Sequence, residues 1–229
     1  MRRRVTAGVK IVLGIGNPGR DYAATRHNVG FRVVDLLAEA NGVEVRRRRF
    51  RGLLGEGTVG RERVLLVKPQ TYVNLSGECA RAVLGFYKEP PESLMVVADD
   101  VNLRLGQLRC RRQGTSGGHN GLESVAACLG TTAFPRLRVG VGRPGAQADD
   151  EDDGGRSRDI VGHVLGGFSR EELPVAEEAE ARAAEAVTEW IGRGVEACMN
   201  RFNAPPPGSG DTDPRGAGEN GRTEGGQDE

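Results

Sequence analysis

The feature that most constrains the fold is a regular alternation between short apolar runs and longer segments with apolar residues at helical spacing. The first run, "KIVLGIG" (10–16), has the length of a buried strand, and "VGFRVVDLLAEA" (29–40) has the pattern of an amphipathic helix. The same two patterns predict strands at 63–69, 93–100, 106–114 and 136–142, and helices at 74–88, 121–130 and 170–191. Strands that alternate with helices indicate an α/β layer fold around one sheet.

Two acidic stretches fall outside this pattern. Residues 146–158 include five acids and two arginines, and residues 204–229 include six acids and two arginines. The second stretch has no apolar period and is rich in glycine and proline, so we expect a disordered tail there and an acidic surface loop at 146–158. The two stretches together carry −7, and because the whole chain is formally neutral the rest carries +7. A basic body favours a polyanionic partner.

Membrane and secreted classes are disfavoured. No apolar run approaches the roughly 18–20 residues that a membrane-spanning helix needs, so we expect no membrane partner. The basic start of the chain leads into a short apolar run that ends in a glycine-rich turn, which we interpret as a first strand rather than a signal peptide. The four cysteines have no C-x-x-C spacing of a zinc or redox site, and we expect reduced thiols in a cytoplasmic protein: Cys79, Cys110, Cys128 and Cys198.

The first predicted strand runs into Gly14-x-Gly16-x-x-Gly19, the glycine spacing of a dinucleotide-binding loop. That fingerprint needs a helix that starts inside the motif, whereas Pro18 interrupts it and several polar residues follow. No acidic residue ends a second strand about 20 residues later, since Asp35 lies inside the predicted helix. A nucleotide-dependent oxidoreductase is therefore a weaker alternative, and cofactor binding would reveal it. We expect the glycines instead to let the backbone turn sharply.

Two of the three histidines are followed by asparagine, in "RHNVG" (26–30) and "GGHNG" (117–121). Both pairs lie beside glycines in polar loops. A single loop histidine is usually structural, but two such pairs beside a separate polar motif, "KPQTYVNLSG" (68–77), favour a functional site.

With these motifs together, the chain resembles the bacterial-type peptidyl-tRNA hydrolases. The resemblance covers residues 9–203, which we take as the catalytic domain, and depends on several blocks that occur in a fixed order. These blocks are "GIGNPGRDYAATRHNVGF" (14–31), "KPQTYVNLSG" (68–77), "VVADDVNLRLG" (96–106), "GTSGGHNGL" (114–122), "FPRLRVGVGRP" (134–144) and "GHVLGGFSREE" (162–172). Val73 departs from the pattern, because the family usually has methionine there.

The resemblance implies a single α/β domain with a central mixed, twisted sheet flanked by helices. It implies a monomer without metal or cofactor that hydrolyses the ester between a peptide and the terminal ribose of tRNA. The catalytic base would be His27, and its orienting carboxylate would be Asp99. The other side chains implied at the substrate site are Asn17, Tyr22, Asn74, His119 and Asn120.

These residue types suit ester hydrolysis. Histidine ordinarily titrates near neutral pH, so a neutral His27 can take a proton from water, and Asp99 can accept from the other ring nitrogen. Neither Ser76 nor Ser116 lies in G-x-S-x-G, so we expect direct attack by water rather than an acyl-enzyme.

An asparagine side chain both donates and accepts. Asn17 could hold the water or the oxyanion through its NH₂ group, and Asn74 and Asn120 could recognise the peptide bond beside the ester. A free aminoacyl group lacks that amide carbonyl, and each unmatched polar group costs about 1–3 kcal/mol, so aminoacyl-tRNA would be spared. The alternative for Asn74 is a helix N-cap.

Arginines would bind the RNA. Arg109 and Arg111 alternate on the predicted strand 106–114 and therefore point to one face, and Arg138 lies on a later strand. The resemblance implies that these positions contact tRNA phosphate, so binding should weaken steeply with added salt. The run "RRRR" (46–49) is either a further contact or a solvated surface run.

One further class stays open, an RNA-binding paralogue on the same fold that has lost catalysis. The presence of His27, Asp99 and the three asparagines argues against it. Binding of N-blocked aminoacyl-tRNA without ester cleavage would favour the paralogue.

Overall fold

A computed structural model describes residues 8–144 and 156–204. Their strands form one seven-stranded sheet in the order β2-β3-β4-β1-β5-β7-β6. The strands are β1 (Lys10–Gly14), β2 (Arg47–Arg49), β3 (Gly52–Val59), β4 (Glu62–Pro69), β5 (Leu94–Asp100), β6 (Leu108–Arg111) and β7 (Arg136–Gly140). The α-helices are α1 (Val29–Ala40), α2 (Ser76–Tyr87), α3 (Asn120–Leu129), α4 (Arg156–Leu165), α5 (Leu173–Arg193) and α6 (Val195–Phe202). Short 3-10 helices are η1 (Arg20–Tyr22), η2 (Arg26–Asn28), η3 (Val73–Leu75) and η4 (Pro91–Ser93).

The sheet is mixed, as predicted. Strands β4, β1, β5 and β7 run parallel to one another, while β2, β3 and β6 pair with antiparallel neighbours. Val12 of β1 pairs with Leu66 of β4 on one side and with Met95 of β5 on the other. The predicted α/β fold is therefore confirmed.

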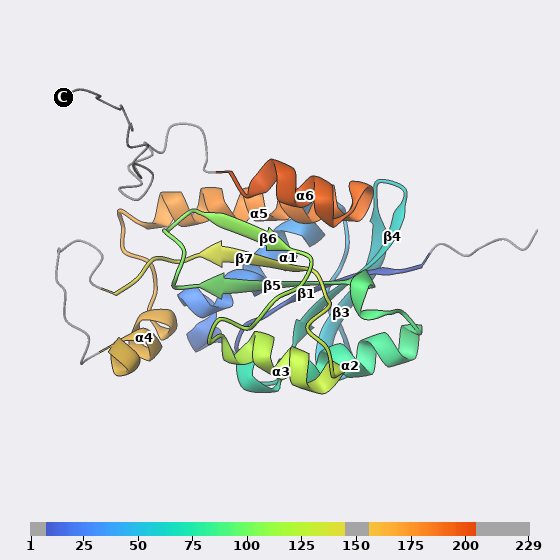
Figure 1. Ribbon diagram of the computed structural model, residues 1–229, viewed down its shortest axis with the longest axis horizontal. Helices are drawn as coiled ribbons and strands as arrows, with labels where there is room; N and C mark the ends of the chain where they lie inside the picture. Colours follow the sequence, from blue (N-terminus) through green and yellow to red (C-terminus); the bar gives the residue numbers. More distant parts are fainter. Residues whose placement is uncertain (1–7, 145–155, 205–229) are drawn as a thin grey trace, which may run out of the picture.

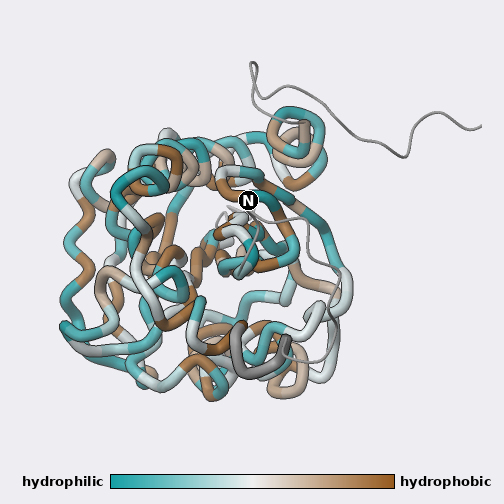
Figure 2. The backbone as a smooth tube through the Cα atoms, turned by 90° about the vertical axis from the view of Figure 1, so that its left-hand side faces the viewer, coloured by the Kyte–Doolittle hydropathy of each residue, from teal (hydrophilic) through white to brown (hydrophobic). Residues whose placement is uncertain are grey.

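Helices cover both faces of the sheet (Figure 1). On one face α1, α5 and α6 pack against a core that includes Val12, Val97 and Trp190, and on the other α2 and α3 pack against Ile11 and Leu13. Successive residues of β1 therefore enter opposite cores, which explains why that strand is apolar without alternation. Figure 2 shows the hydrophilic residues gathered on the outer turns of the helices.

Two strands and two α-helices of the structure were not predicted: β2, β3, α4 and α6. β2 contains three of the four arginines of 46–49, and all three are exposed, which fits both a further RNA contact and a solvated surface run. Charged side chains on an edge strand oppose pairing with another chain. Both missed helices, α4 and α6, lie in the last third of the chain. The predicted strand 106–114 is shorter in the structure, because only Leu108–Arg111 pair with β7.

The acidic loop and the tail lie largely outside the described residues. Of 146–158, the last three residues already belong to α4, so the prediction of a loop was wrong there. Of 204–229, only residue 204 is described. Within the described ranges, no helix combines the length and the apolarity that a membrane crossing requires.

The parallel strands place the predicted residues at one edge of the sheet. The carboxyl ends of β1, β4 and β5 meet there. Asn17, His27 and Asn74 lie in the segments that follow β1 and β4. Asp99 lies within β5, next to its last residue. In open α/β sheets this edge is where ligands bind.

Candidate active site

His27 and Asp99 meet, although 72 residues separate them in the sequence. His27 lies in η2, just before α1, and Asp99 is the second-last residue of β5. Nδ1 of His27 is 2.7 Å from Oδ1 of Asp99. The structure thus brings together the predicted base and its predicted carboxylate.

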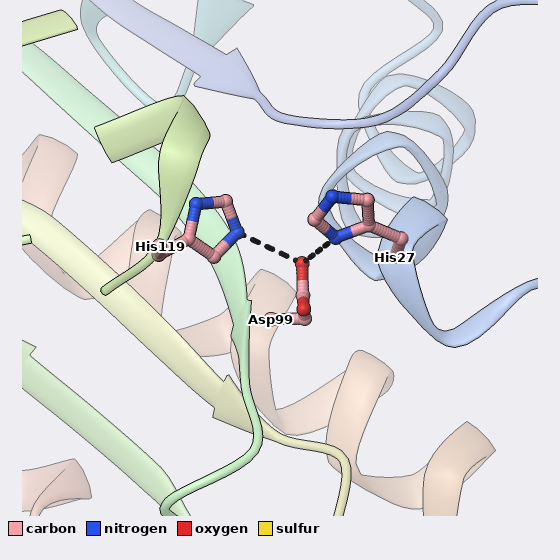
Figure 3. Close-up of side chains that lie close together, drawn as sticks. All are labelled: His27, Asp99 and His119. Carbon is pink, nitrogen blue, oxygen red and sulfur yellow. Dashed lines mark hydrogen bonds and ion pairs between the residues drawn. The ribbon is translucent and has the colours of Figure 1, made fainter. Parts of the chain in front are cut away.

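His119 contacts the same carboxylate oxygen from the other side. Its Nε2 is 3.0 Å from Oδ1 of Asp99, and its ring centroid is 5.2 Å from that of His27. Figure 3 shows Asp99 between the two imidazoles, which come from the segments before α1 and α3. The family resemblance implied only that His119 lies at the substrate site. Its direct contact with Asp99 was not predicted from the sequence.

The hydrogen bonds assign the proton positions on both rings. Nδ1 of His119 accepts from the backbone N–H groups of Gly121 and Leu122 at 3.1 and 3.3 Å, and thereby caps α3. Its Nε2 must then carry the proton and donate to Asp99. Nδ1–H of His27 donates to the same oxygen, which leaves Nε2 of His27 free to accept a proton.

Asp99 stays ionised in this setting. Its side chain is only 3% exposed, and burial by itself raises its pKa. Electrostatic attraction to the His119 and His27 rings and the hydrogen bonds that they donate outweigh burial and hold the pKa of the Asp99 carboxyl well below its usual range. An ionised Asp99 can orient His27 and stabilise the imidazolium that forms during proton transfer.

Asn17 is buried and is connected to the residue that follows His27. Its Oδ1 accepts from the backbone N–H of Val73 at 3.1 Å, and its own backbone N–H donates to Oδ1 of Asn28 at 2.8 Å. The bond from Val73 fixes which end of the amide is oxygen. Within the described part of the chain the Asn17 NH₂ group has no hydrogen bond, so it can donate to a ligand.

A cleft of about 470 Å³ opens beside the histidines. Its polar lining includes His27, Asp99 and Asn120. Helix α4 supplies an apolar wall opposite them, made of Ile160, Val161 and Val164. A larger hollow of about 690 Å³ lies between α1, α5 and α6, but none of the predicted site residues line it.

Three of the predicted catalytic and substrate-binding residues do not line this cleft: Asn17, Tyr22 and Asn74. Asn74 is exposed in η3, and it is not the N-cap of α2, because Leu75 occupies that position. The alternative interpretation of Asn74 as a helix cap was therefore wrong. Tyr22 is half-buried in η1.

The predicted phosphate-binding arginines differ in environment. Arg109 and Arg111 are both exposed while their neighbours on β6 are buried, which confirms that they share one face. Arg138 also lines the cleft, but its Nε lies 3.0 Å from Oδ2 of the buried Asp100. Asp100 thus neutralises part of the positive charge that Arg138 brings to the site.

The two imidazoles and the carboxylate are also a possible ligand set for a metal. Their three facing atoms lie within 4.8 Å of one another, and such groups suit zinc. The contacts to Oδ1 of Asp99, however, have hydrogen-bond lengths, and Nε2 of His119 needs its proton to make one. We therefore interpret the group as two imidazoles hydrogen-bonded to one carboxylate.

The structure identifies residues that the sequence did not single out. Asn28 binds Asn17, Asp100 binds Arg138, and Arg26 ties the loop of His27 to the end of α4. The only sequence signals for them were the His-Asn pair and the double aspartate. Nothing in the sequence indicated that α4 would face the cleft.

Comparisons with known proteins show which family the chain resembles. The family described as "Peptidyl-tRNA hydrolase" matches residues 11–209. A curated peptidyl-tRNA hydrolase of Caldanaerobacter subterraneus subsp. tengcongensis is 49% identical over 193 residues, which is 84% of this chain and 98% of that protein. One of Alkaliphilus oremlandii is 44% identical over the same shares. The crystal structure of peptidyl-tRNA hydrolase from Acinetobacter baumannii superposes with a TM-score of 0.78 at 33% identity, covering 86% of this chain and 95% of that one.

Proposed function

The chain belongs to the peptidyl-tRNA hydrolase family, and we propose that it acts through a water molecule activated by His27. It hydrolyses the ester between a peptide and the terminal ribose of tRNA. The observation that carries the proposal is the 2.7 Å bond between His27 and Asp99, because it leaves the other ring nitrogen free to act as a base.

The first step is attack by water. Nε2 of His27 removes a proton from the water as its oxygen bonds to the ester carbonyl carbon. Asp99 stabilises the resulting imidazolium, and His119 donates to Asp99 and so holds that carboxylate in place. The imidazolium then returns its proton to the ribose oxygen as the ester bond breaks, which leaves a free peptide carboxyl group and tRNA.

Water is favoured as nucleophile over a serine. Ser76, the serine in the motif that contains Asn74, is fully buried at the start of α2. Its hydroxyl has no path to a substrate in this position. A covalent acyl-enzyme would need another nucleophile beside His27, and the residues that line the cleft within the described ranges include no serine or cysteine.

Amide side chains would stabilise and recognise the substrate. The unused NH₂ group of Asn17 can donate to the developing oxyanion, which is worth about 2.7–4 kcal/mol for a well-placed donor. Asn120, in the cleft, and the exposed Asn74 would bind the peptide bond next to the ester. Tyr22 would contact the substrate at the rim of the site.

The tRNA would bind across the edge strand β6. Arg109 and Arg111 present guanidinium groups on its exposed face, and Arg138 offers a third at the cleft. Guanidinium groups pair with phosphate oxygens in a bidentate way. We propose that the protein acts as a monomer in the cytoplasm, where translation releases peptidyl-tRNA.

The deciding experiment is hydrolysis of N-blocked aminoacyl-tRNA by the His27→Ala variant. Loss of the base should reduce kcat/KM by at least ~10²-fold, and added imidazole should restore part of it. Glu92→Gln, on the exposed η4 at the opposite edge of the sheet, is the control and should retain full activity. Near-normal turnover by His27→Ala would remove His27 from the mechanism, and tRNA binding without turnover by the natural chain would indicate a non-catalytic paralogue.

A further inference from the structure

Arg26 precedes the proposed base and is almost completely buried, at 8% exposure. Its guanidinium group does not face the ester site. Instead Nη1 donates to the backbone oxygen of Gly167, Nη2 donates to Glu172 at 2.6 Å, and the group stacks 5.0 Å from the centre of the Phe168 ring. All three partners follow α4 in the sequence.

The backbone reinforces this connection. The N–H of Arg26 donates to the oxygen of Gly166 at 2.9 Å, and Thr25 forms an isolated bridge with Gly167. Nη1 of Arg26 also reaches the oxygen of His163 at 3.4 Å, within α4 itself. The segment before His27 and the carboxyl end of α4 are therefore joined at several points.

Of the α4 side chains that the structure describes, those of residues 160–165, none is buried. Ile160 and Val161 are 38% and 58% exposed, although both line the cleft. The polar ties at its carboxyl end therefore set its position. One is the bond from Nε2 of His163 to the oxygen of Gly142 at 3.0 Å, and the others are those of Arg26.

We propose that Arg26 is a positioning residue for substrate binding, which holds α4 as the apolar wall of the cleft that faces His27. The inference rests on the proposed function, because it assigns the wall formed by Ile160, Val161 and Val164 to the peptide part of the substrate. An apolar wall suits peptide side chains and not phosphate or ribose. A wall fixed before binding avoids the free-energy cost of ordering it when the substrate arrives.

The test compares Arg26→Met and Arg26→Lys with the matched variant Arg32→Met. Arg32 is also partly buried and binds a carboxylate and two backbone oxygens, those of Glu180, Ala23 and Thr25. It shares the Phe168 ring with Arg26, at 5.7 Å from the ring centre, but among the described side chains it has no hydrogen bond to α4 or to the segment 166–172. For a peptidyl-tRNA with an apolar peptide, Arg26→Met should raise KM roughly tenfold, since the ordering cost now falls on binding. The value of kcat should stay unchanged, and so should the pH at which kcat falls to half its maximum on the acid side. Arg26→Lys should bring KM part of the way back to that of the natural chain.

Two further measurements separate this role from general stability. Amide hydrogen exchange at 160–165 should accelerate in Arg26→Met and not in Arg32→Met, and this readout needs no turnover. If Arg26→Met does not fold, Glu172→Gln removes only the charge of the half-exposed partner and should raise KM to a smaller extent. A fall in kcat with unchanged KM, an equal effect of Arg32→Met, or unaltered exchange in α4 would overturn the proposal. Faster exchange in α4 with no hydrolysis by the natural chain would contradict the proposed function alone.

Discussion

Asn17 and Asn28 exchange two hydrogen bonds. The backbone N–H of Asn17 donates to Oδ1 of Asn28 at 2.8 Å, and Nδ2 of Asn28 donates to the backbone oxygen of Asn17 at 2.9 Å. The side chain of Asn28 therefore pairs with both backbone polar groups of the buried Asn17. Because Asn28 follows His27, this exchange fixes the proposed base relative to the amide that would stabilise the oxyanion.

Asn28→Ala should destabilise the fold by about 2–4 kcal/mol, because two buried backbone groups of Asn17 lose their partners. Urea unfolding followed by circular dichroism measures this loss. Asn41→Ala is the matched control, since Asn41 makes a single side-chain bond, to the oxygen of Leu37, and should cost no more than about 1 kcal/mol. Equal losses for the two variants would show that the exchange adds nothing beyond one ordinary hydrogen bond.

The glycines near Asn17 allow β1 and α1 to approach each other closely. A Cβ atom on Gly30 would lie 2.5 Å from the backbone oxygens of both Ile15 and Val97, and one on Gly16 would lie 2.9 Å from the ring of Phe31. The dinucleotide-like spacing thus has a structural use that requires no cofactor. It lets the first turn of α1 contact the end of the sheet directly, which brings His27 to the edge where Asp99 lies.

Gly30→Ala should therefore destabilise the protein by about 3 kcal/mol or more, because backbone atoms cannot move aside as a flexible side chain would. Gly85→Ala is the control. Gly85 is exposed in α2, and a Cβ there would meet nothing within 4 Å, so alanine should raise stability by up to about 1 kcal/mol. Thermal and urea unfolding of both variants test the contrast, and a tolerated Gly30→Ala would refute the close approach.

The strands that could be predicted from the sequence are mainly those that are apolar and buried on both faces of the sheet. β1, β4 and β5 are apolar and buried on both faces, and all three were predicted close to their observed bounds. β3 was missed because it contains Gly52, Gly55 and Gly57, which weaken a strand pattern. The missing side chain of Gly55 is needed in the structure, since a Cβ there would lie 2.7 Å from the oxygen of Glu44.

The site shows the same limit. The family resemblance predicted a site that contains both His27 and Asp99, and these two residues do meet. It also named Asn17, Tyr22 and Asn74, which do not line the cleft. It did not predict that His119 would bind the same oxygen, because that contact depends on the direction in which the segment before α3 approaches β5. The role of Arg26 was also not predictable, because its partners lie about 140 residues away and have no periodic pattern.

The depressed pKa of Asp99 predicts a pH-dependent effect of Asp99→Asn on stability. Burial raises this pKa, but His119 and His27 lower it by more than burial raises it. The pKa in the folded state is therefore below the unfolded value of about 3.9. A carboxyl group of this kind contributes stability that is fully present above about pH 4 and is lost as the pH falls through its folded-state pKa.

Asp99→Asn should therefore lower the unfolding free energy by about 1–3 kcal/mol at pH 7. This gap in unfolding free energy between the variant and the natural chain should narrow below about pH 4. Urea unfolding at pH 7, 5 and 3.5 measures the gap. Asp35→Asn removes an exposed carboxylate that pairs with Lys68 and should cost at most about 1 kcal/mol. A gap that widens as the pH falls would reverse the sign of the linkage and contradict an ionised Asp99.

The adjacent arginines Arg111 and Arg112 offer a test of the tRNA surface. Arg111 lies on the exposed face of β6 without an ion pair in the described residues, whereas Arg112 pairs with Glu196. If Arg111 contacts a phosphate, Arg111→Gln should weaken tRNA binding and reduce the slope of log Kd against log salt by about 0.7–0.9. Arg112→Gln removes the same charge from the neighbouring position, but because Glu196 already compensates that charge it should change the slope much less.

Both slopes can be measured by fluorescence titration of peptidyl-tRNA in the His27→Ala background, in which the expected loss of the base slows turnover during the titration. Equal changes for the two variants would show that only net charge attracts the RNA, and an unchanged slope for Arg111→Gln would place the phosphate contact elsewhere.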